Sequence, residues 1–315
     1  MKAVLQYRAS PAFRTRLLAS APDWLKIVIV DEADREAFRA EIKEADVLLH
    51  VLEPVTAAVM EAAPRLKLIQ KIGVGVNTID QDAARARGIA VANMPGTNSQ
   101  AVAEHTLALM LTVLRRVAYL DRACRQNAGW TLPIDALDRS SEIHGRAIGF
   151  VGYGAVPQRL APALHALGAR VFYYSHAEVN DGIAVRLPSL EDLMRQVDIV
   201  SLHVPLTPTS RGLINEQTLS WVKPGAFLIN TARGELVDEK TLYRALVEGR
   251  LAGAGVDVFA AEPVPADDPL LQLDTFVATP HIGWLTIETL ERSIEVVMEN
   301  CQRLRSAEPL LNQIH

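Results

Sequence analysis

The sequence predicts an α/β protein that contains two doubly wound parallel β-sheets, each covered by helices on both faces. Its 315 residues exceed the ~100–200 residues of a typical domain, which suggests two domains with a cleft between them. Hydrophobic residues make up 49% of the chain and charged residues 22%, the balance of an ordinary globular protein. Short apolar segments alternate with helical patterns in two separate series, and this alternation carries the prediction.

The first series occupies residues 1–95 and predicts five strands. Their sequences are KAVLQY, KIVIV, ADVLLHV, LKLIQKIG and IAVAN, and a stretch with helical spacing separates each from the next. The segments are almost continuous in Val, Ile and Leu rather than alternating, as in strands that are buried on both faces. We therefore expect βαβ units around a parallel sheet.

The second series begins at RAIGFVGYG (146–154). It continues through ARVFYYS, DIVSLHVP, AFLINTAR, AGAGVDVF and TFVATPH. Residues 98–120 between the two series predict one long helix, with Ser99 able to cap its start. Residues 286–305 also show helical spacing, and we expect this helix to return to the first block and make a discontinuous domain.

Charge and composition argue against several classes of protein. The net charge is −5 and no Lys/Arg run occurs, so nucleic acid is not an expected partner. No segment reaches the ~18 apolar residues of a membrane span, and the N-terminus lacks a signal-peptide core, so we expect no membrane partner and a cytoplasmic location. Cys124 and Cys301 cannot complete a zinc site; we predict no metal and two reduced packing residues, unless the fold joins them in a disulfide.

A glycine-rich turn follows the first strand of the second block. The segment GFVGYGAVP (149–157) follows the strand AIGFV and opens a helix, the context that gives such a pattern its meaning. One glycine permits the tight turn and the next lets the backbone approach a pyrophosphate at the positive end of the helix. The residues that we assign to this cofactor contact are Gly152, Gly154, Ala155 and Val156.

Two prolines are unusual features of the helix after this turn. Pro157 occupies the position of the third glycine in the G-x-G-x-x-G pattern, but the first turn of a helix tolerates proline. Pro162 lies deeper in the predicted helix, where we expect a kink or a local irregularity.

The end of the next strand bears on the choice of cofactor. A carboxylate ~20 residues beyond the glycines would bind the ribose 2′-hydroxyl of NAD. Ser175 and His176 stand there instead, and both side chains can hydrogen-bond to a 2′-phosphate. No Arg or Lys is adjacent, however, and Glu178 follows closely. We favour NADP(H) over NAD(H) and leave both open.

Three chemically complementary residues follow three strands of the second block. Arg233 follows AFLINTA, Glu262 comes after AGAGVDVF, and His281 comes after TFVATP. Ligands of open α/β sheets bind at these strand ends. A guanidinium can grip a carboxylate and a carbonyl, an imidazole can transfer a proton, and a carboxylate favours imidazolium. The alternative is an Arg–Glu surface pair and a buried histidine.

Several long motifs follow one another along essentially the whole chain. They are VGVNTID (74–80), NMPGTNSQAVAEHTLALML (93–111), GYGAVP (152–157), SLHVPLTPTSRGLI (201–214), INTARGELVD (229–238), GVDVFAAEP (255–263) and TPHIG (279–283). In this order they resemble the D-isomer-specific 2-hydroxyacid dehydrogenases. The resemblance implies that Arg233 binds the substrate's carboxylate and carbonyl. It also implies that His281, paired with Glu262, protonates the carbonyl oxygen as hydride arrives at the adjacent carbon.

The resemblance implies further contacts. The backbone of Val74 and Gly75 should receive the substrate carboxylate, Asn98 and Ser99 should line the interdomain cleft, and Trp284, an unusual residue for the family, either lines the substrate pocket or packs beneath its loop. Asp257 is expected near the nicotinamide carboxamide. The remaining residues expected to contact the cofactor are His203, Val204, Pro205, Thr209, Thr231 and Ala232. We interpret His105 as a packing or hydrogen-bonding residue, and His50 as able to face the cleft.

The resemblance also implies a domain plan and a function. Residues 1–98 and 286–315 would form a flavodoxin-like substrate-binding domain and residues 99–285 a Rossmann dinucleotide-binding domain, in a homodimer. The expected reaction is reduction of glyoxylate, hydroxypyruvate or a somewhat larger 2-oxo acid. A 3-phosphoglycerate dehydrogenase is an alternative, as is a non-catalytic dinucleotide-sensing protein similar to the C-terminal-binding-protein corepressors. Formate is disfavoured because formate dehydrogenases typically pair the histidine with glutamine.

Overall fold

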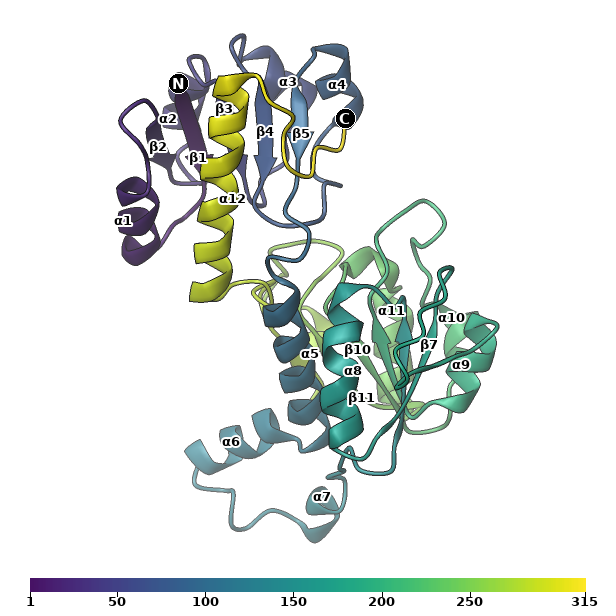
Figure 1. Cartoon of the computed structure of the whole chain (residues 1–315). Helices are drawn as coiled ribbons and strands as arrows, with labels where there is room; N and C mark the ends of the chain where they lie inside the picture. The colour runs from purple at the N-terminus through teal and green to yellow at the C-terminus, as the bar shows by residue number, and fades with distance from the viewer. The chain divides into compact units, whose positions relative to one another are not determined.

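The computed structural model describes the backbone of residues 1–315 and every side chain except that of Leu137. The chain forms two compact units. Unit 1 comprises Met1–Asn98 together with Leu285–His315, and unit 2 comprises Ser99–Trp284 (Figure 1). Each unit contains one parallel sheet with helices on both faces, which confirms the predicted fold class.

Unit 1 is built on a five-stranded sheet in the order β2-β1-β3-β4-β5. Its strands are β1 (Lys2–Gln6), β2 (Lys26–Val30), β3 (Val47–His50), β4 (Leu68–Lys71) and β5 (Ala90–Ala92). Its helices are α1 (Pro11–Ala19), α2 (Arg35–Ile42), α3 (Ala57–Glu61), α4 (Gln81–Ala86) and α12 (Ile287–Ser306). All strand pairs are parallel, and this strand order is that of flavodoxin-like sheets.

The C-terminal segment belongs to unit 1 because polar and apolar contacts tie it to the sheet. Asn300 of α12 donates a hydrogen bond from Nδ2 to Gln70 Oε1 of β4 at 2.5 Å, and Gln313 forms an isolated bridge with Ala92 of β5. Ile294, Val297 and Cys301 are buried on the inner face of the helix. Two segments that lie far apart in sequence thus complete one core.

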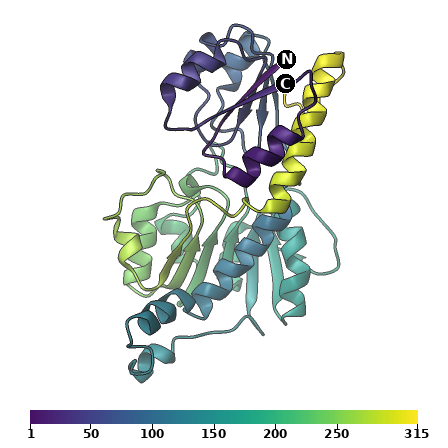
Figure 2. The ribbon, with the colours of Figure 1, turned by 90° about the vertical axis from the view of Figure 1, so that its left-hand side faces the viewer.

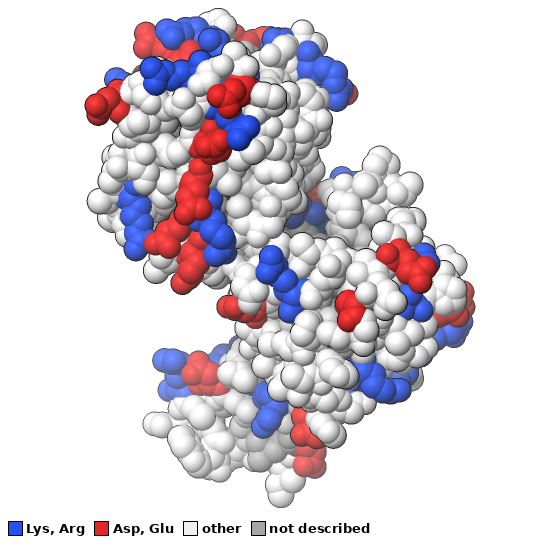
Figure 3. Space-filling view, viewed as in Figure 1, with Lys and Arg blue, Asp and Glu red and all other residues white. Residues whose placement is uncertain are grey.

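The outer face of α12 is charged. Figure 3 shows a column of acidic and basic side chains along this helix. Its members share one face of the helix, and they are Glu288, Glu291, Arg292, Glu295, Glu299 and Arg303. This pattern explains why the segment reads as an amphipathic helix in the sequence. None of the helices in the described chain has both the length and the apolar character needed to cross a bilayer.

Unit 2 is built on a seven-stranded parallel sheet in the order β12-β11-β10-β9-β6-β7-β8. Its strands are β6 (Ala147–Val151), β7 (Arg170–Tyr174), β8 (Val185–Arg186), β9 (Ile199–Leu202), β10 (Ala226–Asn230), β11 (Leu251–Val256) and β12 (Phe276–Ala278). Its α-helices are α5 (Ser99–Leu114), α6 (Val117–Arg125), α7 (Ile134–Leu137), α8 (Ala155–Ala166), α9 (Leu190–Gln196), α10 (Glu216–Ser220) and α11 (Glu239–Val247), and 3-10 turns span Gly234–Leu236 and Pro269–Gln272.

Two separate apolar layers cover the faces of this sheet. On one face α5 and α8 pack against the sheet, with Leu109, Val113 and Leu160 in the buried layer (Figure 2). On the other face α9, α10 and α11 bury residues such as Leu193, Leu219 and Leu242. Burial on both faces accounts for the nearly continuous Val, Ile and Leu content of the strands.

The single long helix predicted for residues 98–120 is instead two helices. The chain breaks the helical pattern between them, because Arg116 adopts a left-handed conformation with φ 53° before α6 begins. Ser99 is the first residue of α5 and is buried. Pro162 lies within α8 without ending it, since the helix continues to Ala166 and the proline ring is exposed.

The two cysteines differ in their surroundings, and both are free. Cys301 is buried in unit 1, and burial raises the pKa of its thiol to about 12, as expected of a packing residue. Cys124 is exposed on α6, so the prediction that it is a packing residue is wrong.

Candidate active site

The glycine-rich turn connects β6 to α8. Gly152 has φ 91°, and a Cβ atom at this position would lie 2.6 Å from the carbonyl oxygen of His203. Its amide donates to the carbonyl of Tyr174 at 2.8 Å, which holds the turn against the end of β7. Gly154 is the N-cap of α8, and a Cβ built there would have no atom within 4 Å. The turn therefore offers a cradle at a helix N-terminus of the kind that fits a pyrophosphate.

Proline in the third position leaves this cradle intact. Pro157 is the third residue of α8, where a backbone N–H would have no partner within the helix, and its ring is buried in the core of unit 2. Ala155 and Val156 form the first turn of the helix with it, so their amides face the same end. The residues assigned to the pyrophosphate thus fit a dinucleotide.

A cation stands at the end of β7, although the sequence shows none adjacent to it. Arg186, the last residue of β8, donates from Nε and Nη2 to the carbonyl of Ser175 at 3.3 and 3.0 Å, and from Nη2 to the carbonyl of His176 at 3.3 Å. No Arg or Lys is adjacent in the sequence, but the pairing of β7 with β8 brings Arg186 to this strand end from eleven residues away.

The loop after β9 lies beside the glycine turn. His203 Nε2 is 2.9 Å from Ser201 Oγ, and its amide donates to Val151 of β6. Desolvation lowers the pKa of His203 to about 3, so the ring is neutral. Val204 is half-buried, whereas Pro205 and Thr209 are exposed. The loop thus packs against the glycine turn and has no ionised group at His203.

A buried asparagine shapes the segment that holds Arg233. Asn230, 1% exposed at the end of β10, donates from Nδ2 to the carbonyl of Arg233 at 2.8 Å and accepts at Oδ1 from the amide of Ala232 at 3.0 Å. Thr231 meets Thr106 of α5 at 2.9 Å between their hydroxyl oxygens. Burial lowers the pKa of Arg233, but an arginine remains charged in proteins.

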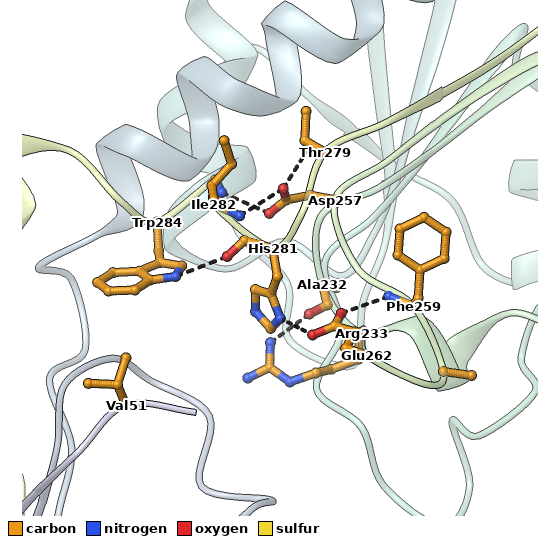
Figure 4. Close-up of polar contacts among 12 residues, drawn as sticks. Val51, Ala232, Arg233, Asp257, Phe259, Glu262, Thr279, His281, Ile282 and Trp284 are labelled. Atoms are coloured by element: carbon orange, nitrogen blue, oxygen red, sulfur yellow. Dashed lines mark hydrogen bonds and ion pairs between the residues drawn. The ribbon is translucent and has the colours of Figure 1, made fainter. Parts of the chain in front are cut away.

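His281 and Glu262 form a hydrogen-bonded pair (Figure 4). His281 Nδ1 lies 2.8 Å from Glu262 Oε2, and the other carboxylate oxygen, Oε1, accepts from the amide of Phe259 at 2.8 Å. Burial raises the pKa of Glu262, but the hydrogen bonds from His281 and Phe259 more than offset it, so the pKa lies below its usual value. The pair therefore leaves His281 Nε2 as the ring nitrogen directed away from the carboxylate.

Asp257 supports the loop that carries His281. Its carboxylate, on a residue 3% exposed, accepts from Thr279 Oγ1 at 2.6 Å and from the amides of Ile282 and Gly283 at 3.0 and 2.8 Å. Burial raises the pKa of Asp257, but these hydrogen bonds and that of His105 bring it below its usual value. His281 itself has φ 55°, a left-handed conformation that its neighbours must stabilise.

Two further residues complete the loop. His105 Nε2 lies 2.8 Å from Thr279 Oγ1, which makes His105 part of the hydrogen-bonded support. Trp284 is half-buried and donates from Nε1 to the carbonyl of His281 at 3.1 Å. The indole is thus bound to the loop, in keeping with packing beneath it, and its edge remains partly accessible.

The substrate-contact residues predicted in the first block lie in unit 1. The Gly73–Gly75 loop follows β4, and it is held by hydrogen bonds from the amide of Met94 to Gly73 and from Asn93 Nδ2 to Val74, both at 2.8 Å. Val74 is exposed, and Asn98 is the last residue of the unit before Ser99 opens α5.

His50 is buried under the end of β3, not open to solvent. Its Nε2 donates to the carbonyl of Glu53 at 2.8 Å. Desolvation, with Lys71 nearby, lowers the pKa of His50 to about 3. The ring is therefore neutral and serves the loop after β3.

Within unit 2 the structure brings Arg233, Glu262 and His281 together at the carboxyl ends of adjacent strands (Figure 4). Sequence reasoning missed Asn230 and Arg186; a buried asparagine at a strand end was the only available signal for the first. Among the described side chains, no group of His, Cys, Asp or Glu is placed to hold a metal ion. A doubly wound domain with a dinucleotide cradle and an Arg, Glu and His cluster at the same sheet edge defines a nicotinamide-dinucleotide dehydrogenase.

Comparison with known proteins gives the family. Residues 107–283 match the model of the D-isomer specific 2-hydroxyacid dehydrogenase NAD binding domain. A glyoxylate reductase of Korarchaeum cryptofilum is 38% identical over 276 residues, which are 86% of this chain and 83% of that protein. The chain belongs to the D-isomer-specific 2-hydroxyacid dehydrogenase family, as the sequence motifs predict.

Two further comparisons bear on the extent of the likeness. A D-3-phosphoglycerate dehydrogenase of Mycobacterium tuberculosis is 39% identical over 292 residues, 90% of this chain but 53% of that protein, so the chain spans about half of that relative's length. A solved structure of a Thermus thermophilus protein is 35% identical with a TM-score of 0.90 and covers 100% of both chains. The two-unit architecture therefore occurs at full length in a solved relative.

Proposed function

We propose that this protein is an NAD(P)-dependent reductase of small 2-oxo acids, and equally a dehydrogenase of the corresponding D-2-hydroxy acids. The observation that carries the proposal is the His281–Glu262 pair beside Arg233, at the sheet edge that also holds the Gly152 turn. An imidazole held by a carboxylate, next to a guanidinium, suits proton transfer to the carbonyl of an anionic substrate.

The proposed reaction assigns one task to each residue. A bound nicotinamide dinucleotide supplies the hydride for reduction. Arg233 binds the substrate's carboxylate and carbonyl oxygen and orients C2. His281 gives a proton from Nε2 to the carbonyl oxygen as the C2–H bond forms and the C=O π bond becomes the C–O single bond of the alcohol. Glu262 stabilises the protonated imidazole and fixes its orientation through Nδ1.

We assign the remaining contacts by unit. Unit 2 is proposed to bind the dinucleotide, and its contacts are Gly152, Gly154, Ala155, Val156, Ser175, His176, His203, Val204, Pro205, Thr209, Thr231, Ala232 and Asp257. Unit 1 is proposed to bind the substrate, with the backbone of Val74 and Gly75 receiving its carboxylate. Asn98, Ser99 and Trp284 complete the proposed substrate contacts. The tight Gly73–Gly75 loop supports this role, since its amides are held by a fixed backbone.

The substrate is proposed to be glyoxylate or hydroxypyruvate. The glyoxylate reductase of Korarchaeum cryptofilum, which matches most of this chain and most of its own length, supports this choice. Oxidation of 3-phosphoglycerate is the second candidate, favoured by the similarity to the Mycobacterium tuberculosis enzyme. A dinucleotide-sensing binding protein would keep the fold without turnover.

NADP(H) is proposed as the preferred cofactor. No carboxylate occupies the end of β7, where Ser175 and His176 lie, so nothing at those two positions repels a 2′-phosphate.

The protein is also proposed to be a homodimer. The segment between α5 and β6 exposes large apolar side chains: Trp130 is 85% and Ile134 77% exposed. Exposed apolar side chains grouped in one segment of unit 2 support an interface there.

The test is a substrate panel followed through the absorbance of the reduced nicotinamide. Glyoxylate, hydroxypyruvate, pyruvate and phenylpyruvate are each reduced with NADPH and with NADH, and 3-phosphoglycerate is oxidised with NADP and with NAD. We expect turnover with the two smallest polar 2-oxo acids. Turnover of 3-phosphoglycerate alone would favour the second candidate, and no turnover with intact cofactor binding would favour the binding protein.

A further inference from the structure

We propose that Arg186 binds the 2′-phosphate of NADP(H) and is the residue of this chain that distinguishes NADP(H) from NAD(H). The inference rests on the proposed preference for NADP(H) and names the side chain that would produce it. Arg186 carries no role in the family motifs of this sequence and is found only through the pairing of β7 with β8.

Arg186 lies beside the end of β7. Strand β8 is two residues long and runs parallel to β7, with Arg186 opposite Tyr173. Tyr174 is opposite Val151 at the end of β6, and its carbonyl accepts from the amide of Gly152 at 2.8 Å. Ser175 is therefore the residue directly after the strand end that holds the glycine turn. In doubly wound dinucleotide domains, the end of this second strand is where the adenosine ribose is bound.

Two backbone carbonyls orient the guanidinium of Arg186. The carbonyls of Ser175 and His176 engage Nε and Nη2 of Arg186 at 3.0 to 3.3 Å. These contacts direct Nη1 away from the backbone, and it lies 3.6 Å from Glu178 Oε2. The guanidinium is thus fixed by backbone oxygens on one edge and meets a carboxylate on another. A planar fork fixed in this way suits a phosphate better than a neutral hydroxyl.

Hydrogen bonds anchor the loop that connects β7 to β8. The hydroxyl of Tyr173 donates to the carbonyl of Val179 at 2.8 Å and accepts from its amide at 2.9 Å. Tyr153, from the glycine turn, donates to Asp181 Oδ2 at 2.5 Å, and the other oxygen accepts from the amides of Ile183 and Ala184. The loop is therefore anchored to the cradle before Arg186 is reached, so the guanidinium needs little ordering when an anion binds.

Glu178 is the acidic partner of Arg186. Its ion pair with Arg186 joins two exposed side chains at 3.6 Å, and such pairs are weak in water. A phosphate dianion carries more charge than the carboxylate and would replace it as the partner of Nη1. Glu178 then repels the 2′-phosphate, so its removal should favour NADP(H).

A purely structural role for Arg186 makes a different prediction. If the guanidinium only closes the loop through the two carbonyls, its loss should weaken NADPH and NADH alike. If it binds the 2′-phosphate, its loss should weaken NADPH and leave NADH nearly unchanged. The ratio of the two effects separates the roles.

The experiment compares wild type, Arg186→Ala, Arg186→Lys, Glu178→Gln and the control Arg170→Ala. Arg170 is an exposed arginine at the opposite end of β7, so the control removes an equal charge from the same strand. Binding of 2′,5′-ADP and of 5′-AMP is measured by calorimetry, and kcat/KM is measured for NADPH and NADH. Direct binding of the nucleotide fragments makes the result independent of the substrate and of catalysis.

We expect Arg186→Ala to weaken 2′,5′-ADP by about 10- to 100-fold and 5′-AMP by less than about 2-fold. Arg186→Lys should give an intermediate loss, Glu178→Gln a gain for 2′,5′-ADP, and Arg170→Ala no selective change. If Arg186→Ala weakens both ligands equally, or leaves binding of 2′,5′-ADP unchanged, the proposed role of Arg186 is overturned. The proposed preference of the wild type for NADPH would still stand in that case. A wild type that prefers NADH would overturn the cofactor preference and the role of Arg186 together.

Discussion

In the reaction that we propose, Glu262 acts through His281, because the carboxylate contacts the imidazole at Nδ1 and the transferred proton belongs to the other ring nitrogen. Its pKa lies below the usual value, despite partial burial, because His281 and the amide of Phe259 hydrogen-bond to the ionised form. A carboxyl group with a lowered pKa keeps its charge at every pH above its ordinary range and loses it only as the pH falls below that range. Glu262 is therefore anionic throughout the working pH range.

Removal of this charge should change the pH profile of 2-oxo acid reduction. Glu262→Gln keeps the size of the side chain and an oxygen acceptor but removes the charge that favours imidazolium. We expect kcat/KM to fall by about 10- to 100-fold, and the alkaline decline of the profile to move to lower pH, because the charge that favours imidazolium is gone. Steady-state kinetics over the pH range of stability measures both effects.

Glu239→Gln provides the matched control. Glu239 is also partly buried and accepts from a backbone amide, that of Ala260, but it does not contact His281. Burial raises the pKa of Glu239, so the protein stabilises its ionised form less than that of Glu262. Replacement of Glu239 by glutamine therefore removes less favourable charge interaction. A profile for Glu262→Gln that declines at the wild-type pH would show that the carboxylate does not set the proton affinity of the pair.

Residues with a distinctive chemistry at strand ends could be predicted from the sequence. Arg233, Glu262 and His281 each lie a few residues beyond the end of an apolar strand, so the rule on carboxyl ends brings them to one edge. Asn230 was missed because it is the last residue of a buried strand and looks like part of it. Arg186 was missed because its position depends on pairing with β7, which no local pattern reveals.

Close backbone contact positions the segment after β10. A Cβ atom on Gly234 would lie 1.9 Å from the carbonyl carbon of Phe259 and 2.3 Å from the amide nitrogen of Ala260. Both atoms belong to the backbone that leads to Glu262, so neither can move without shifting the acidic partner of His281. Gly234 thus keeps Arg233 and Glu262 at a fixed separation.

Gly234→Ala should therefore reduce activity even though alanine suits the backbone conformation at this residue. We expect kcat/KM to fall by about 100-fold or more, because even a small misplacement of reacting groups slows the reaction by such a factor. Gly249→Ala is the control, since Gly249 has φ 72° with no atom within 4 Å of a built Cβ and lies away from the site. The control should lose about 1 kcal/mol of stability and keep its activity. Near wild-type kcat/KM in Gly234→Ala would refute the close-contact argument.

Elements with strong periodicity were predictable, and short or interrupted ones were not. The longer strands coincide with apolar segments that are visible in the sequence. Strand β8 has two exposed residues and is defined by its pairing with β7. The break between α5 and α6 lies at Arg116, a residue without an intrinsic preference for a left-handed conformation. Pro162 lies inside α8 and is exposed, and the helix continues past it to Ala166.

The segment between α5 and β6 offers a test of assembly for the whole molecule. The double variant Trp130→Ser with Ile134→Ser removes the two large apolar side chains that are most exposed among those the structure describes. We expect wild type to show twice the chain mass of 34.5 kDa by light scattering after gel filtration, and the variant to shift toward the monomer.

A control variant separates the interface from general surface polarity. Val247→Ser changes an apolar side chain that is 58% exposed on α11 of the same unit, and it should leave the mass unchanged. A double variant that stays at the wild-type mass would exclude this segment as the interface, and a monomeric wild type would refute the homodimer itself.

The two-block organisation of the molecule was accessible from sequence because each block repeats the same alternation of strand and helix. The C-terminal helix was harder to place, since its amphipathic pattern indicates a buried face without naming the partner sheet. The hydrogen bond from Asn300 to Gln70 supplies that partner. The family motifs added residue roles that periodicity alone does not carry.

We propose that Arg233 and His281 hold a 2-oxo acid in place for a nicotinamide hydride, and Arg233→Ala removes the side chain assigned to the substrate's carboxylate. The measurement pairs the consumption of NADPH with glyoxylate against the affinity for NADPH, determined by calorimetry on the same preparations. We expect kcat/KM to fall by about 10³-fold or more, since a charged contact to the reacting group is lost, while the dissociation constant of NADPH changes by less than about 2-fold. Near wild-type turnover in Arg233→Ala would contradict the proposal.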